Sequence, residues 1–97
     1  MKIDAIKIKE KDNVATALRD LSPHETVRIR EGDEMGESLV EEHIPYGHKF
    51  ALRDIRKGEK ILKYGEVIGQ ATGDISSGTH VHVQNVESLR GRGDLKS

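Results

Sequence analysis

The 97-residue chain has no cysteine and no tryptophan. The absence of thiols excludes disulfides, thiolate zinc sites and cysteine nucleophiles, so any metal must be bound by imidazole or oxygen ligands. Only Phe50, Tyr46 and Tyr64 are aromatic, too few for the stacking surfaces that bind single-stranded nucleic acid. No run of the sequence approaches the roughly 18 consecutive apolar residues of a transmembrane helix.

The chain also has little net charge. Lysine and arginine number 16 against 17 aspartates and glutamates, which leaves a formal charge of -1. Such a balance gives no electrostatic attraction toward nucleic acid or anionic membranes. Residues 1–4 resemble neither an apolar signal core nor an arginine-rich presequence. We therefore expect a cytoplasmic protein with no nucleic-acid or membrane partner.

The length of the chain suits one domain. Apolar residues make up only 34% of it, so the hydrophobic core must be small. A partner chain or a homo-oligomer could supply the missing burial.

Alternating and glycine-punctuated segments predict a mainly β fold. Apolar and polar residues alternate over 5–9 and 26–30, and the charged, glycine-bearing segment 31–37 predicts a hairpin turn or a surface loop. Further strands are expected at 38–44, 48–52, 61–64, 67–71 and 80–86, joined by tight turns at recurring glycines. No internal repeat is apparent.

One short helix is expected after the first strand. Asp12 or Asn13 could cap its N-terminus, and Pro23 would end it. Between them, apolar side chains recur at helical spacing, at positions Val14, Ala17, Leu18 and Leu21. The predicted fold is therefore mainly β with one short helix.

The pair His80 and His82 is the first candidate for chemistry. Side chains two apart in a strand share a face, so the two imidazoles could chelate a metal or hold an anionic substrate. Asn85 follows with an amide suited to a substrate hydroxyl. The alternative is that both histidines are ordinary strand residues, since two histidines alone make a weak metal site.

Two further segments carry candidate groups. His48 follows Gly47 at the start of a predicted strand and could be a third metal ligand or a general base, while Lys49 could bind a carboxylate as a point charge. Tyr64 could donate a hydrogen bond to a substrate oxygen. The alternatives are a turn with solvated side chains around His48, and a hairpin in which Tyr64 serves packing.

The sequence resembles a known family over most of its length. Residues 12–18, 44–52, 61–69 and 78–94 together resemble the small SAF-type, β-clip domain of the altronate/galactarate dehydratase family, found at the N-terminus or as a separate small subunit. They are also similar to the small subunit of sulfolactate sulfo-lyase. Segment 54–61 alone resembles SAF domains in general.

The resemblance implies the small subunit of a metal-dependent sugar-acid dehydratase, which removes water to give a 2-keto-3-deoxy acid. In the sister branch the leaving group would be sulfite. The implied cofactor is a divalent metal, Fe2+ or Mn2+, and the implied partner is a large subunit that shares the site. Residues 1–88 would form the SAF domain, and residues 89–97 a flexible or docking tail.

The resemblance also suggests roles for the candidate residues. His80 and His82 would bind the metal, with His48 as a third ligand or proton shuttle. Lys49 would bind the substrate carboxylate, and Tyr64 and Asn85 its hydroxyls. The competing hypothesis is a non-catalytic module that binds carbohydrate or protein. A catalytic role requires the three histidines to converge, whereas a binding module does not.

Overall fold

A computed structural model describes residues 2–88 of the chain. The predicted tail, residues 89–97, lies outside the described residues. Nothing within 2–88 forms a helix with the length and apolar character needed to cross a membrane.

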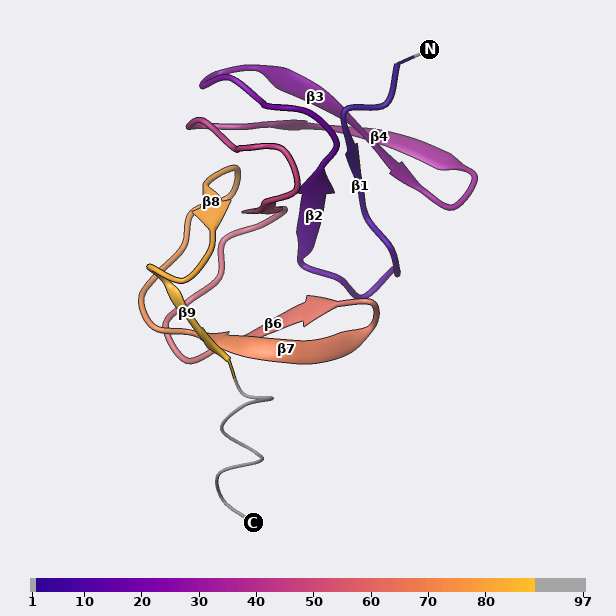
Figure 1. The fold of residues 1–97 in the computed structure, drawn as a ribbon. Coiled ribbons are helices and arrows are strands. Elements are labelled where there is room, and N and C mark those ends of the chain that lie inside the picture. Colours follow the sequence, from indigo (N-terminus) through magenta and orange to yellow (C-terminus); the bar gives the residue numbers. More distant parts are fainter. Residues whose placement is uncertain (1, 89–97) are drawn as a thin grey trace.

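The described chain is entirely β, with nine strands in two sheets (Figure 1). The larger sheet has the order β4-β3-β1-β2-β5-β8, and the smaller has the order β6-β7-β9. The bounds are β1 (Ala5–Ile6), β2 (Val14–Ala17), β3 (Thr26–Glu31), β4 (Glu34–Leu39), β5 (Lys49–Ala51), β6 (Lys60–Lys63), β7 (Glu66–Ala71), β8 (His80–Val81) and β9 (Val86–Ser88).

The chain passes between the two sheets three times. It leaves the larger sheet after β5, returns to it at β8, and crosses again through the turn at 82–85 to reach β9. In Figure 1 the smaller sheet lies below the larger one, with β8 and β9 on the side that joins them. The expected single strand over 80–86 is therefore wrong, because a turn splits it into one strand for each sheet.

The predicted short helix is also wrong, since its segment forms β2. β2 lies between β1 and β5 in the larger sheet, and Val14, Ala15 and Ala17 are all buried. A strand covered on both faces shows no alternation of apolar and polar residues, so its apolar positions imitated helical spacing. Leu18 and Leu21 lie beyond the strand, and Leu21 forms an isolated bridge with Ile44.

The two expected capping residues connect the sheets instead. The carboxylate of Asp12 accepts hydrogen bonds from the backbone N–H groups of Lys9, Tyr64 and Gly65 at 2.8–3.0 Å. The Asn13 amide donates to the Lys60 carbonyl at 2.9 Å and accepts from the Leu62 N–H at 2.8 Å. These bonds hold the β6–β7 hairpin against the segment before β2.

Strand boundaries differ in the acidic segment as well. The 31–37 region is a hairpin, as expected, but its turn is confined to residues 32–33 and β4 extends over Glu34–Leu39. β4 is an edge strand and its residues are largely exposed. The strand expected over residues 38–44 is therefore wrong beyond Leu39, where β4 ends.

A turn of one kind recurs four times, a repeat that the sequence did not reveal. The four copies are 22–25, 45–48, 56–59 and 76–79, and in each the last N–H donates to the first carbonyl. The third residue has a positive φ of 66°, 83°, 90° or 86°, at His24, Gly47, Gly58 and Gly78, which is the requirement of a type II turn. We call these the repeated turns.

The repeated turns come in pairs. The residue before each turn forms an antiparallel bridge with the residue before another turn, in the pairs Leu21 with Ile44 and Ile55 with Ile75. All four bridge residues are buried. Leu21 and Ile44 belong to the apolar cluster that contains Phe50, and Ile55 and Ile75 belong to the one that contains Ile61.

Candidate metal centre

The three candidate histidines come from two neighbouring strands. His48 ends a repeated turn directly before β5, His80 begins β8, and His82 follows β8. β5 and β8 are antiparallel, with Phe50 opposite His80. Continuing this register by two residues places His48 opposite His82, and residues that are opposite or two apart share one face of a sheet. The ladder thus gathers all three imidazoles.

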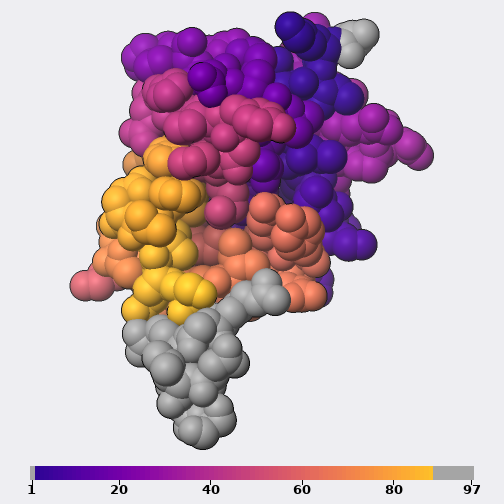
Figure 2. All heavy atoms as spheres, in the orientation of Figure 1, coloured from indigo at the N-terminus to yellow at the C-terminus, as the bar shows by residue number. Residues whose placement is uncertain are grey.

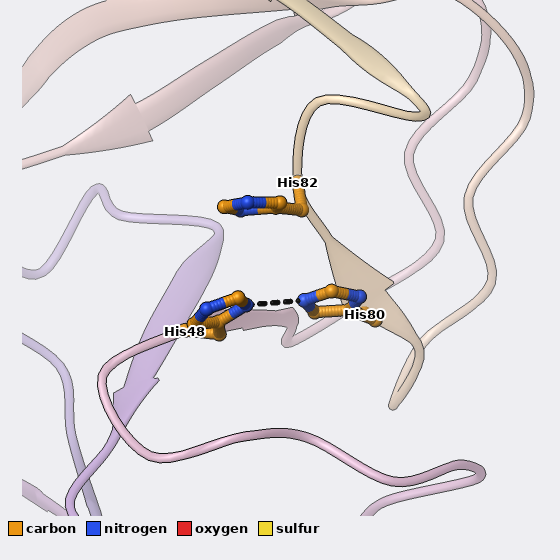
Figure 3. Close-up of side chains that lie close together, drawn as sticks. All are labelled: His48, His80 and His82. Atoms are coloured by element: carbon orange, nitrogen blue, oxygen red, sulfur yellow. Dashed lines mark hydrogen bonds between the residues drawn. The ribbon is translucent and has the colours of Figure 1, made fainter.

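The imidazoles lie in a nearly parallel group (Figure 3). Their planes differ by 14–22°, and their centroids are 4.3–5.3 Å apart. The His48 Nδ1 and His80 Nε2 atoms are 2.8 Å apart. One nitrogen from each ring lies within 4.8 Å of the others, and each residue is partly buried. Figure 2 shows that the orange-to-yellow part of the chain lies at the surface, and all three histidines are partly exposed.

This spacing fits a divalent ion. Two imidazole nitrogens that each lie ~2.1 Å from an ion are about 3.4 Å apart in tetrahedral geometry, so a small widening of the 2.8 Å between His48 Nδ1 and His80 Nε2 would admit an ion. Three protein nitrogens with open positions remaining are typical of catalytic rather than structural metal sites.

The electrostatic surroundings favour neutral imidazoles. Burial, followed by the nearby His48, lowers the pKa of both His80 and His82 below the ordinary value. Glu42 opposes this effect at His80. A lowered pKa keeps the lone pairs of both rings available at neutral pH, which metal binding requires.

Asn85 lies beside the histidines but holds the backbone. Its Oδ1 accepts from the His82 N–H at 3.0 Å, and its Nδ2 donates to the His80 carbonyl at 2.8 Å. Both ends of the amide thus fix the turn that presents the rings. Its sequence position three residues after His82 is typical of a turn side chain that bonds nearby backbone, which is a signal the sequence analysis missed.

Two other residues around His80 were not anticipated. A carboxylate oxygen of Glu42 accepts from the His80 N–H at 3.0 Å. The side-chain amide of Gln84 lies 3.3 Å from the His80 Nδ1. Gln84 lies within the strand expected over 80–86, on the face expected for His80 and His82, whereas Glu42 comes from a segment distant in sequence that only the fold brings to His80.

Lys49 lies next to the group on the opposite face of β5. It lines a cavity of about 230 Å³ together with His82 and apolar side chains from β7, β8 and β9. Burial, then the neighbouring Lys63, lowers the Lys49 pKa. None of the ion pairs identified among residues 2–88 involves Lys49.

Tyr64 is not brought to the histidines. It occupies the β6–β7 turn with a φ of 61°, and its ring lies 4.8 Å from the Lys63 Nζ. In Figure 1 this turn lies at the opposite end of the smaller sheet from β8. The backbone N–H of Tyr64 bonds to Asp12 and the residue is 53% exposed, so its side chain belongs neither to the histidine group nor to the core.

Residues 3–89 match the family described as the altronate/galactarate dehydratase SAF domain. The chain belongs to this family. It is 45% identical to altronate dehydratase of Escherichia coli over 83 residues, and 43% identical to that of Bacillus subtilis over 84 residues. It is also 45% identical over 51 residues to (2R)-sulfolactate sulfo-lyase subunit alpha of Chromohalobacter salexigens.

The two altronate dehydratases are much longer than this chain. Each altronate dehydratase match covers 86% of the chain but 16% of the relative, and the sulfo-lyase match covers 53% of the chain and 54% of the relative. The chain therefore corresponds to the SAF domain of enzymes that are dehydratases or lyases.

Proposed function

We propose that this chain is the small subunit of a metal-dependent sugar-acid dehydratase and contributes half of an active site shared with a large subunit. The observation that carries the proposal is the convergence of His48, His80 and His82. A non-catalytic SAF module would have no need to gather three imidazoles that come from two strands. The 45% identity over 51 residues to (2R)-sulfolactate sulfo-lyase subunit alpha supports the role of a subunit.

The three histidines would hold a divalent cation, Fe2+ or Mn2+. When bound, such an ion polarises the carboxylate and 2-hydroxyl of a sugar acid and makes the proton at C2 more acidic. Lys49, beside His82 in the neighbouring cavity, would hold the substrate carboxylate by charge.

Elimination then needs a base and an acid. If two histidines hold the cation, His48 would take the C2 proton; if all three hold it, the base would come from the large subunit. The C3 hydroxyl would leave as water after accepting a proton, and the resulting enol would tautomerise to the 2-keto-3-deoxy acid. The same geometry would serve a substrate that loses sulfite, an alternative favoured by the identity with sulfo-lyase subunit alpha.

The test is co-expression with a candidate large subunit, followed by assay of altronate, galactarate and sulfolactate. We expect the 2-keto-3-deoxy product from one of the two sugar acids and none from the small chain alone. Turnover of sulfolactate alone would replace the dehydratase by the sulfo-lyase. No turnover of any of them would favour a binding module.

Matched variants test the centre itself. The His80→Ala, His82→Ala double variant should lose bound metal and turnover, whereas His24→Ala should change neither, because His24 is exposed in a different repeated turn. Unchanged metal content in the double variant would remove both residues from the site. Lys49→Met should raise KM more than it lowers kcat.

A further inference from the structure

Both ring nitrogens of His80 have a neighbour. Nε2 lies 2.8 Å from His48 Nδ1, and Nδ1 lies 3.3 Å from the Gln84 side-chain amide nitrogen. A neutral imidazole carries one N–H and one lone pair. The partner at Nδ1 therefore decides whether His80 Nε2 presents a proton or a lone pair to His48.

In the arrangement seen here, the Gln84 amide acts as a donor. Its Nε2 faces both the His80 Nδ1 and the His80 carbonyl, the latter at 3.5 Å. With Nδ1 as acceptor, the ring proton of His80 is on Nε2 and is donated to His48. This tautomer closes the space between the two rings with a proton.

A cation between the same two nitrogens requires the other tautomer. The lone pair must then be on His80 Nε2 and the proton on Nδ1, which needs an acceptor. Rotation of the Gln84 amide by half a turn exchanges its nitrogen for its oxygen and provides that acceptor. Metal-bound histidines commonly donate their second N–H to such an outer group.

We propose that Gln84 is a positioning residue that sets the tautomer of His80, with its amide nitrogen favouring the proton-closed pair and its amide oxygen favouring the metal-binding form. The inference rests on the proposed metal centre and deepens it. Within residues 2–88 the hydrogen bonds of the Gln84 amide both go to His80, so we assign its effect to that ring and not to substrate.

Two substitutions separate the two orientations. Gln84→Glu offers only acceptor oxygens and fixes the metal-binding tautomer, so it should bind Zn2+ about tenfold more tightly than the unmodified chain. Gln84→Met has the same length without a hydrogen-bonding group and should bind about tenfold more weakly. Gln70→Glu is the charge-matched control, because Gln70 bonds to Lys60 on the smaller sheet, and its affinity should stay within about twofold.

The tautomer itself can be read without any metal. Long-range 15N–1H NMR spectra of the metal-free chain should show the His80 proton on Nε2 in the unmodified chain and on Nδ1 in Gln84→Glu. A purely structural role for Gln84 would leave this pattern unchanged. Because Gln84 is exposed in a turn, the variants should keep the amide spectrum of the folded chain.

The two readouts distinguish the failure of each proposal. If the unmodified chain binds Zn2+ but all variants share its affinity and tautomer, the role of Gln84 is refuted and the metal centre stands. If the chain binds no Zn2+ while Gln84→Glu still moves the proton, the metal centre fails and the tautomer control stands. Zn2+ affinities that rise equally in Gln84→Glu and Gln70→Glu would also refute the inference, since charge alone would explain them.

Discussion

Replacement of Asp12 by alanine tests how the two sheets are joined. The carboxylate accepts three backbone hydrogen bonds, from Lys9, Tyr64 and Gly65. Hydrogen bonds to a charged group contribute about 1.5–3 kcal/mol each, and the exposed turn allows water to replace part of that. We therefore expect Asp12→Ala to lower the free energy of unfolding by about 3–4 kcal/mol. A helix-capping aspartate would cost only about 1 kcal/mol, so the size of the loss separates the two interpretations.

Equilibrium unfolding in urea measures this loss. An unchanged dependence of the free energy of unfolding on urea concentration would show that the surface exposed on unfolding is the same in both proteins. In thermal unfolding the same loss corresponds to a fall in Tm of about 12–30 °C for a domain of this size. Asp20→Ala is the control, because Asp20 accepts one backbone bond, from the Tyr46 N–H, and should cost about 1 kcal/mol. A loss below about 1 kcal/mol in Asp12→Ala, or one equal to that of Asp20→Ala, would refute the reasoning.

Two further predictions concern stability. Burial alone would raise the pKa of Asp4, but its backbone and Arg19 hydrogen bonds outweigh burial and lower it, and the Arg19 hydrogen bond lowers the pKa of Glu25. Both groups therefore add stability that is complete above their unfolded pKa values near 4 and is lost as the pH falls through the lower folded values. Midpoints of urea unfolding measured between pH 7 and pH 2.5 should show this loss. An equally steep loss in Arg19→Met would contradict the prediction. Gly78→Ala should destabilise the chain more than Gly58→Ala. Both positions require a positive φ, which costs alanine about 1–2 kcal/mol, but an added Cβ at Gly78 would lie 2.4 Å from the Leu39 carbonyl oxygen whereas the space at Gly58 is open. Equal losses in urea unfolding would show that the clash relaxes at no cost.

The sequence predicts those strands whose two faces differ. Residues 26–30 alternate and form β3, in which Val27 and Ile29 are buried. The pattern of β2 predicts a helix because the burial of both faces of the strand removes the alternation of apolar and polar residues on which strand prediction depends. The pairing of such short strands depends on partners distant in sequence, and the local pattern does not contain this information.

The candidate site was only half visible for the same reason. His80 and His82 are two residues apart, so strand geometry alone places their rings on one face. His48 lies 32 residues before His80, and its approach depends on the register of β5 with β8. The sequence offered His48 as a hypothesis, and the ladder supplies the proximity. The substrate roles of Asn85 and Tyr64 stay predictions from residue type; the Asn85 amide bonds to the backbone of His80 and His82, and Tyr64 lies in the β6–β7 turn.

The repeated turns give an independent reason to regard His48 as functional. In three copies the side chain after the positive-φ residue bonds back to its own turn. Glu25 and Glu59 accept from the first N–H of their turns, at 2.9 and 2.6 Å, and the Thr79 hydroxyl donates to the Ser76 carbonyl at 2.7 Å. At the equivalent position His48 directs its ring to His80.

A turn that gives up its supporting side chain loses about 1 kcal/mol, and such departures from a local rule concentrate at functional sites. If that cost is incurred for function, replacing His48 by threonine should raise the stability of the chain by about 1 kcal/mol and abolish metal binding. A threonine hydroxyl can donate to the Pro45 carbonyl as Thr79 donates to Ser76, whereas a glutamate could not restore a bond because Pro45 has no N–H. A His48→Thr variant that is no more stable than His48→Ala would show that the fourth turn needs no such bond. The position of His48 would then carry no functional information beyond its distance to His80.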